Sequence, residues 1–236
     1  MMKNNVINKR GVDESKILFS IFFIVAFAEV IAEFFADKFF IYFLKPLLIP
    51  ILTFIYWKTS NQKSGYFIIA MFFALLANVF FISKDFNSIL LGAIFFMFYR
   101  IIAIYLVLKI VKIKGYLPVL LGSVPFIIMF MYVTCLTMDE MNNSGLYIYI
   151  MQVIFMSFLG GFSLANYIID ENKMNYWLFI SSILFTIIQL ILILKIYYIS
   201  ISIFQPLSMI LYVFAQYAFY KFMLLSENLD NDASSC

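Results

Sequence analysis

Long apolar runs separated by short polar breaks dominate this chain. Each run approaches the ~20 mostly apolar residues that a membrane-spanning helix needs, and lipid can cover apolar surface that a soluble core of this size could not bury. The pattern therefore predicts an all-α protein, a polytopic membrane helix bundle with eight transmembrane helices. The expected spans are residues 17–36, 39–57, 66–83, 88–110, 116–137, 146–169, 176–197 and 202–225.

Polar segments mark the limits of the membrane domain. We expect a polar cytoplasmic N-terminal segment over residues 1–16, a transmembrane domain over residues 17–225 and a polar cytoplasmic tail over residues 226–236. The weakest boundary lies between the last two spans, near residues 199–202, because few polar residues interrupt the apolar sequence there.

Basic residues are distributed unevenly between the two sides of the predicted bundle. Loops that face the cytoplasm are enriched in Lys and Arg. Eleven basic residues fall on the side of both termini and three on the other side, which predicts both termini in the cytoplasm (N-in, C-in) and suits a bacterial inner membrane. The eleven are Lys3, Lys9, Arg10, Lys16, Lys58, Lys63, Lys109, Lys112, Lys114, Lys173 and Lys221, and the three are Lys38, Lys84 and Lys195.

Composition narrows the possible functions. Only 12% of the residues are charged, against about 25% in soluble domains. The chain contains no His, which excludes His-based acid–base catalysis, Ser-His or Cys-His nucleophiles and His-ligated metals. We therefore expect no metal and no cofactor. The net charge of +3 is small and its basic residues are scattered, so no nucleic-acid partner is expected.

Three ionisable residues lie inside the first two predicted spans. An ionisable side chain within a span costs about 2.5–3.5 kcal/mol on insertion scales, so each one marks a candidate site. Glu29 and Glu33 share one face of their helix, because they are one turn apart. Lys45 lies at the depth of Glu29 in the following helix, which predicts a Glu29–Lys45 ion pair. This pair either pins the helical hairpin or lines a polar cavity.

Arg100 lies near the middle of its predicted span, too deep for its side chain to reach the interface comfortably. It needs a partner inside the bundle, and Glu29 or Glu33 are the carboxylates at a similar depth. Arg100 either binds a lipid phosphate or closes a charge network. Gln189 and Gln216, near the middle of the last two spans, are expected to form hydrogen bonds between helices.

Faces of small residues indicate close helix packing in two spans. One face comprises residues 70, 74 and 78 (Ala, Ala, Asn), and the other comprises residues 157, 161 and 165 (Ser, Gly, Ala).

Several short motifs occur in the order and spacing of a known family. Residues 45–47 (Lys-Pro-Leu) open the second span, and residues 212–216 (Tyr-Val-Phe-Ala-Gln) match a closing Tyr-x-x-Ala-Gln. Asn78 and Asn166 end segments that are placed like helices ending in Gly-Asp and Ser-Asp. On these motifs the chain resembles the YhhN family over nearly its whole length. That family includes the lysoplasmalogenases, eight-helix membrane proteins that hydrolyse the vinyl-ether bond of lysoplasmalogen lipids.

The resemblance implies a catalytic pair of Asp residues at the positions that Asn78 and Asn166 occupy here. A carboxyl pair can deliver a proton and activate water, whereas an amide exchanges no proton in this way. The Ser of the family's second motif falls on Ala165, and a family His falls on Arg100. The residues expected to contact substrate are Lys45, Arg100, Tyr212 and Gln216.

Three functions are compatible with these residues. The first is a lysoplasmalogenase-type hydrolase of a single-chain ether lipid, impaired by the loss of the Asp pair or with its acid moved to Glu29 or Glu33. The second is a non-catalytic protein that binds a lysolipid, and the third is a small transporter. The expected partner is a membrane lipid or lysolipid, and no oligomeric state is predicted. A polar cavity in the outer half is expected, lined by Glu29, Lys45, Asn78 and Arg100.

Overall fold

The computed structural model of the protein describes residues 2–83, 85–199 and 201–234, with side chains described within residues 16–227 of these ranges. Lys84 and Ser200, which belong to two of the predicted breaks, lie outside the described residues. The described chain is all-helical, with eight α-helices, one short 3-10 turn at Met138–Glu140 and no strand. The helices are α1 (Met2–Phe35), α2 (Lys38–Thr59), α3 (Gly65–Phe80), α4 (Phe86–Ile110), α5 (Tyr116–Thr137), α6 (Asn143–Ile169), α7 (Lys173–Tyr197) and α8 (Phe204–Ser234).

The polar breaks in the sequence act as helix caps. Asp37 Oδ1 accepts a hydrogen bond from the backbone N–H of Phe39 at 3.0 Å, where α2 begins. Ser64, Asp85 and Asn172 cap α3, α4 and α7 in the same way. Each cap satisfies a backbone N–H that the helix itself leaves without a partner. Each predicted span lies on one of the eight helices, and these caps fix where four of the helices begin.

The first and last helices are longer than their predicted spans. α1 begins at Met2 and α8 continues to Ser234, so the two polar end segments are helical continuations of the bundle. The predicted boundary near residues 199–202 is correctly placed, because α7 ends at Tyr197 and α8 begins at Phe204.

Helix length separates α3 from the other helices. Seven described helices are long and apolar enough to cross a membrane. α3 has 16 residues, which at ~1.5 Å per residue extend about 24 Å, less than the ~30 Å hydrocarbon core.

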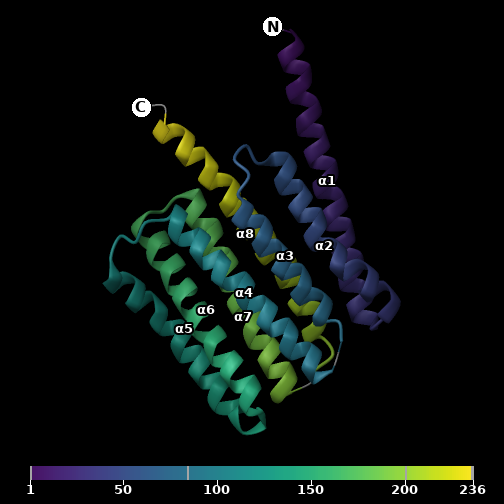
Figure 1. The fold of residues 1–236 in the computed structure, drawn as a ribbon, viewed down its shortest axis with the longest axis vertical. Helices are drawn as coiled ribbons and strands as arrows, with labels where there is room; N and C mark the ends of the chain where they lie inside the picture. The colour runs from purple at the N-terminus through teal and green to yellow at the C-terminus, as the bar shows by residue number, and fades with distance from the viewer. Residues whose placement is uncertain (1, 84, 200, 235–236) are drawn as a thin grey trace.

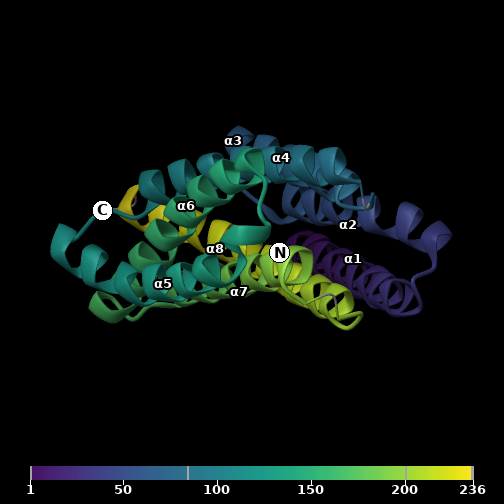
Figure 2. The ribbon, with the colours of Figure 1, turned by 90° about the horizontal axis from the view of Figure 1, so that it is seen from below.

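Consecutive helices run in opposite directions, and most of them pack against each other (Figure 1). The exception is the pair α4 and α5: α4 packs against α6 instead. α8 packs against α7, α1 and α2, so the last helix returns to the first. Seen from below, the bundle is elongated, with α1 and α2 toward one end and α5 toward the other (Figure 2).

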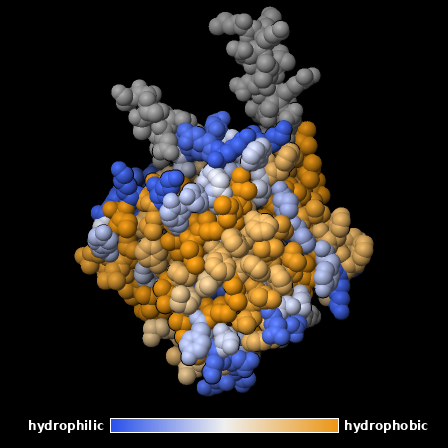
Figure 3. All heavy atoms as spheres, in the orientation of Figure 1, coloured by the Kyte–Doolittle hydropathy of each residue, from blue (hydrophilic) through white to orange (hydrophobic). Residues whose placement is uncertain are grey.

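Apolar side chains cover the middle of the surface, and polar side chains gather at its two ends (Figure 3). Bulky apolar residues on several helices are strongly exposed, including Phe27, Phe43, Leu120 and Tyr132 at 62% or more. A soluble monomer rarely exposes a continuous apolar surface of this extent. Together with the seven long apolar helices, this belt makes the chain an integral multi-pass membrane protein.

An exposed ion pair joins two connections at one end of the bundle. Lys114, which follows α4, lies 2.8 Å from Asp170 at the end of α6. The hydrogen bond from Lys114 holds the pKa of the Asp170 carboxyl below its ordinary value. A lowered carboxyl pKa contributes stability at higher pH that is lost as pH falls through the folded-state value. Because both side chains are exposed, this contribution is at most about 1 kcal/mol.

Candidate functional site

Four buried polar side chains from three helices form a continuous hydrogen-bonded chain inside the bundle. Asn78 Nδ2 of α3 and Gln216 Nε2 of α8 both donate to the hydroxyl of Tyr212, each at 3.1 Å. The Tyr99 hydroxyl of α4 donates to Gln216 Oε1 at 3.3 Å. All four residues are at most 7% exposed. The structure therefore brings together three residues that the sequence pointed to, Asn78, Tyr212 and Gln216.

Asn166 does not join this chain. It lies in the last turn of α6, and Asn78 lies in the last turn of α3. These two helix ends are at opposite ends of the bundle (Figure 1). Asn166 Nδ2 donates to the Phe162 carbonyl of its own helix at 2.8 Å, and its Oδ1 has no hydrogen-bond partner in the described chain. The two Asn side chains thus occupy separate polar environments.

Arg100 is held by amides and not by carboxylates. Its Nη1 donates to Gln152 Oε1 at 3.3 Å, and its Nη2 donates to Gln189 Oε1 at 2.9 Å. The expected partner, Glu29 or Glu33, is wrong, since Arg100 donates to Gln152 and Gln189. α1 packs mainly against α2 and α8. The expected interhelical hydrogen bonds of Gln189 and of Gln216 are confirmed.

The positive charge of Arg100 has no neutralising partner among the described residues. The side chain is 2% exposed, its Nε–H makes no hydrogen bond, and its nearest ring, Phe96, offers a cation–π contact at 4.6 Å. A guanidinium does not lose its proton in proteins. A buried charge without a counter-ion costs several kcal/mol, so Arg100 marks a candidate anion site.

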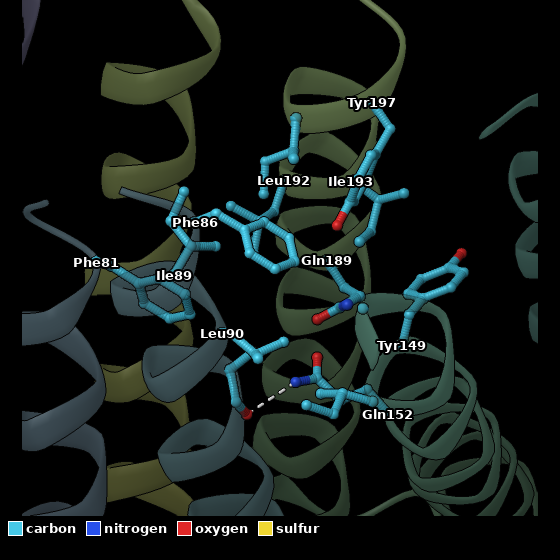
Figure 4. A pocket seen from close by; sticks show the side chains of 14 residues that line it. Phe81, Phe86, Ile89, Leu90, Tyr149, Gln152, Gln189, Leu192, Ile193 and Tyr197 are labelled. Atoms are coloured by element: carbon cyan, nitrogen blue, oxygen red, sulfur yellow. Dashed lines mark hydrogen bonds between the residues drawn. The ribbon is translucent and has the colours of Figure 1, made fainter. Parts of the chain in front are cut away.

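A cleft opens where α4 and α6 begin and α7 ends (Figure 4). Gln152 and Gln189, the two amides that hold Arg100, are among its lining residues. Gln152 Nε2 donates to the Ala93 carbonyl at 2.9 Å, and the Tyr197 hydroxyl points into the cleft. Its volume is about 40 Å³, room for roughly three water molecules. The apolar walls include Phe81, Phe86, Ile89, Leu90, Leu192 and Ile193.

A second charged group connects α1, α2, α7 and α8. Lys45 Nζ lies 2.6 Å from Glu33 Oε1, Gln205 Nε2 donates to the same oxygen at 3.1 Å, and Lys195 donates to Gln205 Oε1. The expected Glu29–Lys45 ion pair is wrong by one helical turn. Side chains lean toward the N-terminus of their helix, so Lys45 reaches back toward the start of α2, where Glu33 lies.

Glu29 is fully buried one turn deeper than this ion pair. Neither of its carboxyl oxygens has a hydrogen-bond partner in the described chain. Its charged neighbours are Lys45 and Glu33. A buried carboxyl group without a partner is costly for folding alone, and it is therefore a candidate for chemistry.

The cleft and a smaller cavity at Arg100 do not bring together Glu29, Lys45, Asn78 and Arg100, the residues expected to line one common cavity. The cleft is lined by α4, α6 and α7 together with Phe81, and the smaller cavity is lined by α4, α6, α7 and α8. Neither cavity is lined by Glu29, Lys45 or Asn78. The Lys45–Glu33 ion pair and the Arg100 group are separate because α8 lies between two parts of the bundle. On one side of α8 is the hairpin formed by α1 and α2, and on the other side is α7.

Sequence reasoning missed Tyr99, Gln152 and Gln205 as members of these groups. Gln152 and Gln205 could have been found from the sequence, because an amide within or beside an apolar span marks a candidate polar contact. Tyr99 could not, since Tyr residues are also common as interfacial anchors.

The fold and the buried polar groups define a class: a polytopic α-helical membrane protein whose interior combines hydrogen-bonded amides with isolated charges. Comparison with known proteins narrows this class. The sequence profile of the YhhN family matches residues 40–222, so the chain belongs to the YhhN family. No curated protein and no solved structure matches the chain. The matched region contains Asn78, Arg100 and Asn166, whereas Glu29 and Glu33 precede it.

Proposed function

We propose that this protein binds a single-chain ether lysolipid within the membrane and has lost lysoplasmalogenase-type hydrolysis because an amide, Asn78, stands where the resemblance implies a catalytic Asp. The observation that carries the proposal is the buried chain in which Asn78 donates to Tyr212. An amide at this position keeps the hydrogen bond and removes the exchangeable proton. Membership of the YhhN family supports the lipid class.

The chemistry of vinyl-ether hydrolysis explains why this substitution matters. One water is consumed: a proton adds to the alkene carbon remote from the ether oxygen, and the water oxygen adds to the carbon beside it. The resulting hemiacetal splits into a fatty aldehyde and a glycerol hydroxyl. Both the proton donor and the group that activates water must exchange protons, and carboxyl groups do so whereas amides do not.

A second candidate function is hydrolysis by a carboxyl pair in α1. Glu33 is held by Lys45 and Gln205, while the neighbouring Glu29 has no hydrogen-bond partner in the described chain. Two carboxyl groups in different environments can divide the acid and base roles between them. Because both precede the matched region of the family, such a pair would be particular to this chain.

Hydrolysis and binding of lysoplasmalogen by the purified protein test the first proposal. We expect the wild type to bind the lipid and to release no aldehyde above background. Asn78→Asp restores a carboxyl group beside Tyr212, and it should raise aldehyde release. Asn166→Asp alone is the matched control, since Asn166 lies at the other end of the bundle.

Two results would redirect the interpretation. Robust wild-type turnover that Glu29→Gln abolishes would favour the carboxyl pair in α1 over the binding function. An absence of lysoplasmalogen binding by the wild type in lipid nanodiscs would contradict both candidates.

We also propose that all eight helices cross a bacterial inner membrane with both termini in the cytoplasm. The alternation of helix direction places both termini at one end of the bundle (Figure 1). In the sequence, the loops on the predicted side of both termini hold eleven Lys and Arg residues against three on the other side.

A further inference from the structure

The cleft between α4, α6 and α7 combines a buried positive charge with apolar walls. Arg100 lies behind the cleft, buried and without a carboxylate partner among the described residues. Such a charge is costly to bury unless an anion accompanies it. The described protein supplies amide oxygens only, which take two of the five guanidinium N–H groups.

Gln189 connects this charge to the cleft. Its Oε1 accepts from Arg100 at 2.9 Å, and the same residue lines the cleft, so its Nε2 is the amide group available to a ligand there. Figure 4 shows its amide beside the cleft, on the same side as the Tyr197 hydroxyl. A hydrogen bond that an amide oxygen accepts from a cation polarises the amide and strengthens its own N–H donors. The Nε2–H groups of Gln189 are therefore stronger hydrogen-bond donors toward a ligand in the cleft.

Helix direction adds to the attraction for an anion. α6 begins at Asn143 without a side-chain cap, and the cleft lies beside its first turn, at Gly145. The start of α4 is already capped by the Asp85 carboxylate and adds no attraction. The N-terminal ends of helices carry partial positive charge. This effect at α6 acts in the same direction as Arg100.

The size and walls of the cleft select the kind of anion. The volume of about 40 Å³ accommodates a group the size of a few water molecules, such as a carboxylate. The apolar walls, with Phe86 and Leu90 on α4 and Ile193 on α7, suit the first methylene groups of a chain. We propose that this cleft binds the carboxylate of a fatty acid, held by Gln189 Nε2 and balanced by Arg100. This site is distinct from the Asn78–Tyr212 chain of the proposed function.

The decisive variant is Gln189→Glu, which places a carboxylate of the protein itself beside Arg100. It fills the need for a counter-ion, so the variant should unfold at a higher temperature than the wild type. It should also weaken binding of radiolabelled oleate roughly tenfold or more, because the new carboxylate repels the ligand. Oleyl alcohol, which has the same chain and no charge, should bind the wild type at least about tenfold more weakly than oleate does.

Controls separate this site from the proposed lysolipid function. Lys112→Gln removes an exposed cation from the connection after α4 and should leave oleate binding unchanged. Lysoplasmalogen binding should survive Gln189→Glu if the two sites are distinct. If Gln189→Glu fails to fold, Gln189→Leu removes the same donor, and the same loss of oleate affinity is expected.

Two outcomes would overturn the assignment. Oleate that binds Gln189→Glu and Gln189→Leu as tightly as the wild type would remove the cleft as its site. A lysophospholipid or inorganic phosphate that competes for the cleft, where oleate shows no binding, would assign the site to a phosphate and not to a carboxylate.

Discussion

Tyr212 uses one hydroxyl oxygen to accept hydrogen bonds from two amides on different helices. Asn78 and Gln216 each donate to it at 3.1 Å. A buried donor that loses its acceptor costs about 1–3 kcal/mol, because water cannot replace the partner. The hydroxyl of Tyr212 is therefore expected to contribute more to stability than a single hydrogen bond would.

Replacing Tyr212 with Phe removes the shared acceptor and leaves two buried amide donors without it. We expect Tyr212→Phe to lower the free energy of unfolding by about 1–3 kcal/mol, measured by equilibrium unfolding in mixed detergent micelles. Tyr132→Phe is the matched control, since Tyr132 is 67% exposed and should change stability little. Equal stabilities of the two variants would contradict the shared-acceptor role.

Single residues were predicted well where the local helix pattern defines them, and poorly where packing between distant helices defines them. Tyr212 and Gln216 are one turn apart, so the sequence alone places them on one face. The partners of Arg100 could not be found from depth alone, because depth does not reveal which helices touch. The error over Lys45 has another cause, the direction in which a helical side chain leans.

Helices α5 and α6 approach each other most closely at two glycines. A Cβ added to Gly122 would lie 2.7 Å from the carbonyl oxygen of Gly161, and one added to Gly161 would lie 2.6 Å from the backbone nitrogen of Ser123. Both contacts are with backbone, which cannot move aside as a side-chain end can. The small-residue face over residues 157, 161 and 165 predicted this kind of close packing.

Gly161→Ala should therefore push α5 and α6 apart. We expect a loss of about 1–3 kcal/mol in the free energy of unfolding, from steric overlap that the backbone must relieve. Gly65→Ala serves as the control, because a Cβ there meets no atom within 4 Å. Thermal unfolding in the same detergent compares the two, and a Gly161→Ala protein as stable as the Gly65→Ala protein would refute the close approach.

At the level of elements, the spans were the most predictable feature. Each follows from an apolar run of the length that a bilayer requires, closed by residues such as Asp37 and Ser64 that cap the next helix. The early end of α3 at Phe80 was not predicted, since the apolar sequence continues through Ile82.

At the scale of the whole molecule, the proposal that α3 crosses the membrane predicts that its two ends lie on opposite sides of the bilayer. In a protein with Cys135→Ser and Cys236→Ser, single cysteines at Asn61 and Ser83 flank α3. A membrane-impermeant maleimide should label Ser83→Cys in spheroplasts and should label Asn61→Cys only after permeabilisation. Asp139→Cys, in the turn between α5 and α6, should be labelled like Ser83→Cys. Labelling of Asn61→Cys and Ser83→Cys from the same side would show that α3 does not cross.

The shortness of α3 has a consequence for the surrounding lipid. If α3 crosses the bilayer as proposed, a helix of about 24 Å in a hydrocarbon layer of ~30 Å leaves a mismatch, which the bilayer would relieve by thinning beside it. Asn78, in the last turn of α3, then lies beneath a dimple where water and head groups reach deeper than elsewhere. Longer-chained lipids resist such thinning. The thickness of the host membrane would therefore control how readily a lipid from the bilayer approaches the Asn78 end of the protein.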